Sequence, residues 1–320
     1  MTRAFPPEIA DDLKRAARLE YWTIGWMLSI ILVMGLVMGS SQAMQTAWIE
    51  DVLSLIPAIV FLIAVHFEKK DPTGPFPFGY QRVHSLAFLI SAVALTIMGT
   101  VLLFESAMTL VRQEHVTVPP MRLFGEDIWM GWLMIGALLY SVVPPVILGR
   151  MKLPLARRLQ DEVLHTDALM QKADWMTGLA GIGGILGIGL GLWWADALAA
   201  GIISLSIVQD GVTALRIATA ELVDGAPREL GSTGPDPEAE LLEEKLARQY
   251  PGARVRLRET GRYIHAEVSG VEPDPVQDLK ALWPGDPDRS WRLAQLSFVP
   301  PDEGVVMPAY VTGAGRPRSR

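Results

Sequence analysis

Six long apolar segments occupy the first two thirds of this chain and restrict the folds that it can adopt. A bilayer core about 30 Å thick needs roughly 20 helical residues for each crossing. Segments of about that length lie at 21–39, 48–66, 84–111, 128–148, 164–190 and 195–218. Half of the 320 residues are hydrophobic, and the last third of the chain is comparatively polar. The sequence therefore predicts an α-helical membrane protein with six transmembrane helices.

Lysine and arginine residues are distributed unevenly between the predicted loops. Four precede the first segment, three lie between the second and third, and four lie between the fourth and fifth. The loops on the other side contain only Arg112 and Arg122. Because basic loops remain in the cytoplasm, we expect both termini to face it. The expected location is the cell inner membrane, as an integral multi-pass protein in contact with the lipid bilayer.

Small residues recur at helical spacing in the last two predicted crossings. The fifth segment contains Gly183, Gly187 and Gly191. The sixth repeats the four-residue spacing with Ala197 and Gly201. Such spacing lets helices approach closely in lipid, so we expect the fifth and sixth helices to form a tight hairpin.

The composition changes after residue 223. The stretch from Pro227 to Pro237 is rich in Gly, Pro and Ser and is typical of a linker. Periodic apolar patterns then predict a helix, two strands, a helix and a strand. These elements fall at 238–250, 254–258, 262–268, 276–283 and 293–299. Their order predicts a small α+β domain.

These patterns divide the chain into five parts. We expect a cytoplasmic leader at 1–20, a six-helix transmembrane domain at 21–224, a linker at 225–237, a cytoplasmic α+β domain at 238–300 and a disordered tail at 301–320. The chain has no cysteine, which excludes disulfides and thiolate metal ligands. The net charge is −7 and there is no basic stripe, so we expect no nucleic-acid partner.

Acidic residues inside the fifth predicted crossing indicate ion chemistry. Spacings of three and four place Asp167, Met170 and Asp174 on one helical face. A carboxylate at the middle of the bilayer costs roughly 2.5–3.5 kcal/mol on insertion scales. Two carboxylates on one face therefore require compensation by a cation, a proton or both. The sequence predicts a protein that moves ions.

The second predicted crossing also contains polar residues near its outer end. Glu50 and Ser54 are four residues apart and share a helical face. Asp51 points about 100° away from Glu50, because adjacent helical residues are rotated by that angle. It is therefore difficult for both carboxylates to ligate one ion together with Ser54. Asp51 is left as a water-mediated ligand, a proton relay or the true ligand in a shifted alignment.

The pattern of crossings, acidic residues and a C-terminal αββαβ segment resembles the cation diffusion facilitator family. The local match is Phe76-Pro-Phe-Gly-Tyr-Gln-Arg82, which is similar to the family segment His-Pro-Phe-Gly-Tyr-Gly-Arg-x-Glu. The resemblance implies a homodimer that exports divalent metal ions in exchange for protons. It also implies that the cytoplasmic α+β domain is ferredoxin-like.

The resemblance also implies where the metal site lies. Family members use two residues four apart on the second helix and two residues four apart on the fifth, normally Asp or His. On the fifth helix this pair falls on Met170 and Asp174. On the second helix, an ungapped alignment gives Glu50 and Ser54. A shift of one residue gives Asp51 and the leucine four residues later.

We therefore expect a metal site made mainly of oxygen atoms. The candidate ligands are Glu50, Asp51, Ser54, Asp167, Met170 and Asp174. Asp167 is either an added ligand or part of the access path from the cytoplasm. Oxygen ligands favour Mn²⁺, Fe²⁺ or Mg²⁺, and the resemblance adds Zn²⁺ and Co²⁺ as transported substrates. Facing carboxylates repel one another, so we expect protons to bind the empty site and no prosthetic group to be needed.

The sequence also allows two other function classes to be compared with a transporter. The departures from the family pattern are consistent with a non-transporting member that acts as a membrane scaffold or partner subunit. An intramembrane aspartyl protease using Asp51 and Asp174 requires a G-x-G-D arrangement, whereas here the glycines follow Asp174. We therefore expect a transporter and not an enzyme.

Overall fold

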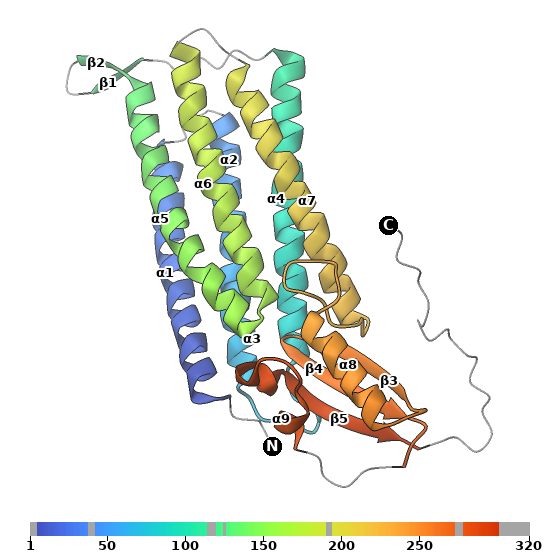
Figure 1. Ribbon diagram of the computed structural model, residues 1–320. Helices are drawn as coiled ribbons and strands as arrows, with labels where there is room; N and C mark the ends of the chain where they lie inside the picture. The colour runs from blue at the N-terminus through green and yellow to red at the C-terminus, as the bar shows by residue number, and fades with distance from the viewer. Residues whose placement is uncertain are drawn as a thin grey trace.

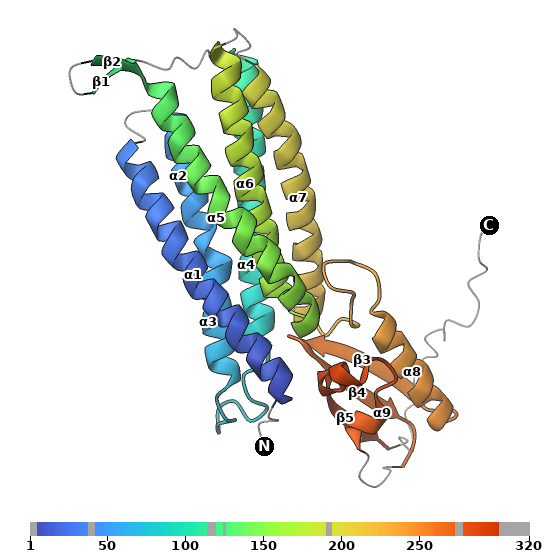
Figure 2. The same cartoon turned by 60° about the vertical axis from the view of Figure 1, so that its left-hand side comes forward.

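The computed structural model describes residues 5–37, 42–113, 120–123, 126–189, 194–272 and 278–300. Long helices form a bundle, and a small domain with a sheet lies at one end of it (Figure 1). The predicted tail at 301–320 lies outside the described residues. A two-stranded hairpin that the sequence did not predict, β1 (Pro120–Leu123) and β2 (Glu126–Trp129), lies at the opposite end of the bundle (Figure 2).

Within the part of the chain that the structure describes, seven helices make up the bundle. They are α1 (Pro7–Val37), α2 (Gln42–Leu53), α3 (Leu55–Glu68), α4 (Arg82–Arg112), α5 (Met130–Leu159), α6 (Glu162–Gly189) and α7 (Ala195–Leu222). Within the described residues, five segments are long and apolar enough to cross a membrane, and α2 and α3 together supply one of them. The fifth predicted crossing corresponds to α6, which is 28 residues long but is not among these five segments.

The N-terminal leader and the first predicted crossing form one helix. α1 runs without a break from Pro7 to Val37. Leu13 and Ala16 are buried in the largest apolar cluster of the structure, which also contains Phe61 of α3. The leader from Pro7 onward therefore packs into the bundle.

The second predicted crossing is divided in two at Ser54. Pro57 has no backbone N–H with which to bond the carbonyl group of Leu53, and its ring crowds that carbonyl. α2 accordingly ends at Leu53 and α3 begins at Leu55. The proline thus places Ser54 at a helix junction inside the bundle.

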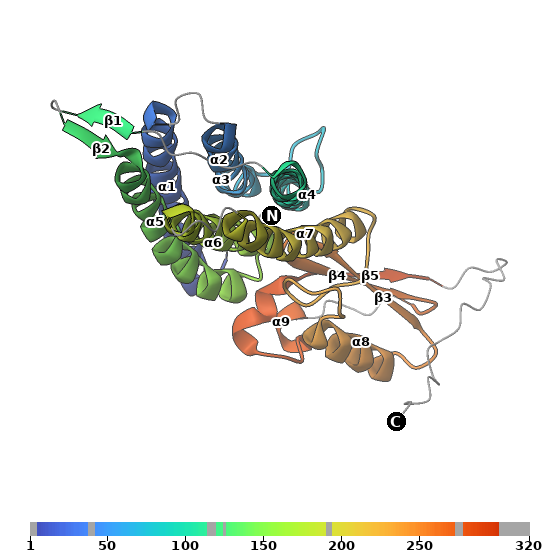
Figure 3. The same ribbon diagram turned by 90° about the horizontal axis from the view of Figure 1, so that it is seen from above.

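Packing of the bundle places α6 near its centre. Viewed along the bundle, α6 lies between α5 and α7 (Figure 3), and it also contacts α3 and α4. The expected tight hairpin of the fifth and sixth crossings is not the main pairing, since α7 packs chiefly along α4 and α6 chiefly along α5. A Cβ atom added to Gly211 of α7 would lie 2.8 Å from the Cα atom of Thr96 of α4. Small residues therefore bring α7 close to α4.

The small domain has the predicted order of elements. It contains α8 (Pro237–Gln249), β3 (Arg254–Thr260), β4 (Tyr263–Ser269), α9 (Leu279–Leu282), a 3₁₀ turn (Pro287–Arg292) and β5 (Leu293–Val299). The sheet order is β3-β4-β5, with β3 antiparallel and β5 parallel to β4. Asp236 caps α8 by accepting a 2.8 Å hydrogen bond from the backbone N–H of Glu238. Leu242 and Leu246 then pack against the buried face of β4.

The predicted linker is folded against the bundle. The backbone N–H of Glu229 donates to the carbonyl oxygen of Gly234 at 3.1 Å, which closes a loop. The backbone N–H of Gly231 donates to Oε1 of Glu162, the first residue of α6, at 2.9 Å. The linker therefore fixes the small domain close to the start of α6.

A buried arginine joins the small domain to the bundle. Arg262, in the turn between β3 and β4, has no exposed surface. Its Nη2 atom lies 2.9 Å from Oδ2 of Asp161 and 3.4 Å from Oε2 of Glu68. Nε2 of His84 lies 2.9 Å from the same oxygen of Asp161. Burial opposes ionisation of Asp161, but the charges of His84 and Arg262 outweigh it and lower the pKa of this carboxyl well below its usual value.

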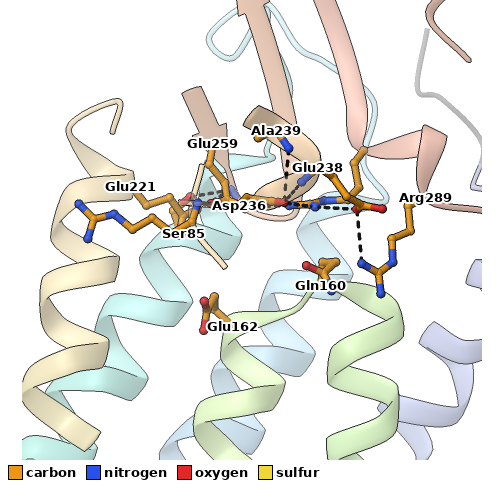
Figure 4. A network of polar contacts seen from close by, with 12 residues as sticks. Ser85, Gln160, Glu162, Glu221, Asp236, Glu238, Ala239, Glu259 and Arg289 are labelled. Atoms are coloured by element: carbon orange, nitrogen blue, oxygen red, sulfur yellow. Dashed lines mark hydrogen bonds and ion pairs between the residues drawn. The ribbon is translucent and has the colours of Figure 1, made fainter. Parts of the chain in front are cut away.

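The residue before the arginine is held just as closely. Gly261 has φ +62°, and its backbone N–H donates to Oγ of Ser85 at 3.0 Å and to Oε1 of Glu221 at 2.6 Å. Ser85 and Glu221 lie where the helix ends meet the small domain in Figure 4. An added Cβ at Gly261 would lie 3.0 Å from Cβ of His84. Both the left-handed backbone and the narrow space therefore favour glycine here.

We predict that Arg262→Ala loosens the small domain from the bundle. The substitution removes the guanidinium group from Asp161 and Glu68, and breaking a buried ion pair in this way typically costs about 3–5 kcal/mol. Amide hydrogen exchange in β4 should become faster than in the unmodified protein. Arg256→Ala is the control, because Arg256 forms an exposed 2.8 Å ion pair with Glu267, worth about 0–1 kcal/mol. Equal exchange rates in the two variants would contradict the prediction.

Candidate metal site in the helix bundle

Two of the candidate ligands meet directly in the bundle. Oγ of Ser54, at the junction of α2 and α3, donates to Oδ1 of Asp174 of α6 at 2.7 Å. Ser54 has no exposed surface. The second carboxylate oxygen of Asp174 is buried and has no hydrogen-bond partner among the residues that the structure describes. The contact therefore leaves one carboxylate oxygen with unused capacity.

The helix junction directs consecutive side chains to different neighbours. Ser54 points to α6, whereas Leu55 packs with Met27, Ile30 and Met34 of α1. In the ungapped alignment Ser54 is the second member of the helix-two pair, and in the shifted alignment it is Leu55. Ser54, the second residue of the ungapped pair, therefore faces Asp174.

Glu50 and Asp51 lie one turn before Ser54 in α2. Glu50 is 7% exposed, Asp51 is half-buried, and the carbonyl oxygen of Glu50 accepts the backbone N–H of Ser54 at 2.9 Å. Glu50 and Asp51 each repel the carboxylate of Asp174 electrostatically. Glu50 is also repelled by Glu105 of α4. Carboxylates from three helices therefore repel one another in this part of the bundle.

Met170 lies in an apolar environment one turn before Asp174. Its side chain has no exposed surface and packs with Leu95 and Met98 of α4. The sulfur atom of Met98 lies 3.8 Å from Oγ of Ser54. Sequence reasoning did not single out Met98, because no spacing rule connects α4 with the α2–α3 junction.

Asp167 is held in a separate ionic cluster. Nζ of Lys152 lies 2.8 Å from Oε2 of Glu20 and forms an ion pair with Asp167 as well. All three side chains lack exposed surface. Asp167 is seven residues before Asp174, which is about 10 Å along the helix axis. The structure therefore does not bring Asp167 to the contact of Ser54 with Asp174.

Sequence reasoning missed this cluster for two reasons. The fourth predicted crossing ended at residue 148 and assigned Lys152 to a cytoplasmic loop, whereas α5 continues to Leu159. Glu20 was assigned to the end of the leader, whereas it lies within α1. Hydropathy alone gave no sign that these charged residues are buried.

The described ranges contain no group of three or more His, Cys, Asp or Glu side chains that is already arranged to hold a metal ion. Ser54 and Asp174 supply two oxygen atoms that are in contact. A complete coordination shell therefore requires a further side chain, and Glu50 and Asp51 are the carboxylates next to this pair.

Comparison with known proteins identifies the family. A family model described as the cation efflux transmembrane domain matches residues 22–223. The chain therefore belongs to the cation efflux family, which confirms the resemblance seen in the segment from Phe76 to Arg82. This is a family of transporters and not of enzymes, as expected, and its members are integral multi-pass membrane proteins.

Several relatives align with a large part of this chain. The manganese efflux system protein MneS of Bacillus subtilis is 22% identical over 218 residues, which cover 67% of this chain and 71% of the relative. The zinc transporter ZitB of Escherichia coli is 24% identical over 271 residues, which cover 83% of this chain and 76% of the relative. A probable cation efflux system protein of Mycobacterium tuberculosis is 22% identical over 269 residues, 83% of this chain and 74% of the relative.

We predict that thiols introduced at the two contacting positions can be bridged. The chain has no cysteine, so the double variant Ser54→Cys, Asp174→Cys contains only these two thiols. A mercuric ion, which prefers soft thiolate ligands, should bridge them and protect them from maleimide labelling. The variant Leu55→Cys, Asp174→Cys is the matched control and should remain labelled, because Leu55 packs against α1. Equal protection of the two pairs would show that the register is wrong.

Proposed function

We propose that this protein exports divalent metal cations from the cytoplasm in exchange for protons, by alternating access. The contact between Ser54 and Asp174 is the observation that carries the proposal. It joins the two segments that the family uses for transport, at a carboxylate with one unused oxygen atom. Membership of the cation efflux family supports transport of a cation.

The electrostatics of the bundle support exchange with protons. Glu50, Asp51 and Asp174 repel one another in a region largely shielded from water. Protons reduce this repulsion when the site is empty, and a dication that binds displaces them. Binding of metal on one side and of protons on the other would then couple the two fluxes.

The donor atoms rank the candidate substrates. Carboxylate and hydroxyl oxygen atoms suit Mn²⁺, Fe²⁺ and Mg²⁺ better than Zn²⁺ or Co²⁺. The relatives MneS, a manganese efflux protein, and ZitB, a zinc transporter, show that both kinds of cation occur among similar chains. We propose that Mn²⁺ and Fe²⁺ are preferred, and that all five ions need to be compared.

The membrane arrangement that we propose includes α6 as a sixth crossing. Asp167 and Asp174 of this helix point to partners on neighbouring segments, which offsets the cost of placing these acids in lipid. Phe5 stacks on Tyr263 of the small domain with 6.1 Å between ring centroids, so both lie at the same end of the bundle. The basic loops are on that side, and we propose that both termini face the cytoplasm of the cell and that the protein acts as a homodimer.

We predict that Asp174→Asn abolishes metal-driven proton flux in liposomes. The amide cannot supply the negative charge that binds a dication, so flux with Mn²⁺ should fall to that of empty liposomes. Asp210→Asn is the matched control, because Asp210 is a half-buried acid of α7 outside the proposed site. Unchanged flux in Asp174→Asn would refute the site. Absence of flux in the unmodified protein with Mn²⁺, Fe²⁺, Zn²⁺, Co²⁺ and Mg²⁺ would instead favour a non-transporting scaffold.

We predict that Glu50→Gln and Asp51→Asn differ in their effects on Mn²⁺ transport. Glu50 shares the helical face of Ser54, so its substitution should lower transport by at least about tenfold, equivalent to roughly 1.4 kcal/mol. Asp51 points away from that face, so its substitution should cause a smaller loss. Initial rates measured over a series of Mn²⁺ concentrations test this order. Equal, mild losses would mean that α2 supplies no ligand.

A further inference from the structure

The ionic cluster of Lys152, Glu20 and Asp167 has an unusual charge balance for the interior of a helix bundle. Its members come from α5, α1 and α6, and none has exposed surface. A single ammonium group lies between two carboxyl groups, so the cluster contains two acids for one cation. A purely structural ion pair would need only one of the two acids.

Several oxygen and nitrogen atoms in and around this cluster form no hydrogen bond within the described residues. Oε1 of Glu20 and Oδ1 of Asp167 are buried and have no hydrogen-bond partner in the described part of the chain. The same holds for both amide atoms of Gln171, which has no exposed surface. Buried polar atoms normally have hydrogen-bond partners, so this group of atoms without partners indicates a place for a ligand.

Gln171 lies on the face of α6 that leads from the cluster to Asp174. Asp167, Gln171 and Asp174 are separated by four and three residues and therefore share one face. Gln171 is also packed against α5, because a Cβ atom added to Gly149 would lie 3.1 Å from its Cβ atom. Gly149 precedes Lys152 by three residues, which places both on the same face of α5. Gln171 therefore packs against the face of α5 that carries Lys152.

A metal ion could take the position of the ammonium group. An ammonium ion has only donors and is held here by carboxylate oxygen atoms. Two carboxylates and a carboxamide oxygen atom are hard ligands of the kind that Mn²⁺ and Mg²⁺ accept. Asp167 lies between Asp174 and Glu162, the first residue of α6, which contacts the linker of the small domain. A cation that moves from that end toward Asp174 would meet it first.

We propose that Glu20, Asp167 and the side-chain oxygen atom of Gln171 form a second divalent-cation site, which the Lys152 ammonium group occupies when no metal is bound. This inference rests on the proposed transport function and adds a binding step before Asp174. An incoming cation displaces the ammonium group from the two carboxylates and is then passed along the α6 face. Lys152 is a positioning residue, because it keeps the two carboxylates together and compensates part of their charge.

Equilibrium binding of Mn²⁺ to the full chain in nanodiscs tests the site. Lys152→Gln removes the resident cation that competes with the metal, so this variant should bind Mn²⁺ at the second site several-fold more tightly than the unmodified protein. Lys172→Gln is the matched control, because Lys172 is exposed on α6, and its Mn²⁺ affinity should not change. Lys152→Gln combined with Glu20→Gln keeps the net charge of the cluster and should lose this binding event. An unchanged affinity in Lys152→Gln would overturn the proposal.

A second measurement uses the unmodified protein and does not depend on whether a variant folds. Displacement of the ammonium group should raise acetylation of Lys152 by acetic anhydride several-fold when saturating Mn²⁺ is added, as quantified by mass spectrometry. Lys172 is the internal reference. Acetylation of Lys152 that does not respond to Mn²⁺ would overturn the proposal.

The Asp174→Asn variant separates this inference from the proposed function. If the second site exists, the response of Lys152 acetylation to Mn²⁺ should persist in Asp174→Asn, although transport is lost. If Asp174→Asn transports normally, the proposed transport site fails while the acetylation response still reports on the second site. If transport is lost but Lys152 never responds, only the second site fails.

Discussion

A charge buried between apolar helices is stable only when another group compensates for the water that it loses. This constraint acts at three successive positions along α6. Asp161, just before the helix, is paired with Arg262 of the small domain. Asp167 is paired with Lys152 of α5. Among the described residues, Asp174 is hydrogen-bonded to the hydroxyl group of Ser54 and forms no ion pair with a cation. The first two acids thus have a cation built into this part of the chain, and the third does not.

This difference explains why we place the exported cation at Asp174. A resident arginine or lysine makes a carboxylate a permanent part of the fold, whereas a hydroxyl group satisfies one oxygen atom and leaves the charge uncompensated. Glu50 and Asp51 add to the negative charge from α2. A divalent cation or protons would remove this imbalance, and neither would be tied to the chain.

The junction of the small domain with the bundle depends on the same physics. Arg262 and Gly261 form a turn that reaches the ends of α3, α4 and α7 and the α5–α6 connection. Glu162 and the loop around Gly231 attach the same region to the start of α6. A movement of α6 that changes access to Asp174 would therefore also act on the small domain, through contacts that are largely buried.

The sequence by itself determined the elements, because helices and strands depend on near neighbours. Apolar runs predicted the long helices, alternation predicted β3 to β5, and acid spacing singled out Asp174. Only the tertiary structure decided the partners. It broke a predicted helix at Ser54, paired α7 with α4, and extended α5 so that Lys152 became buried beside Asp167. The partner of a buried charge depends on which helices pack together, and no local pattern records that.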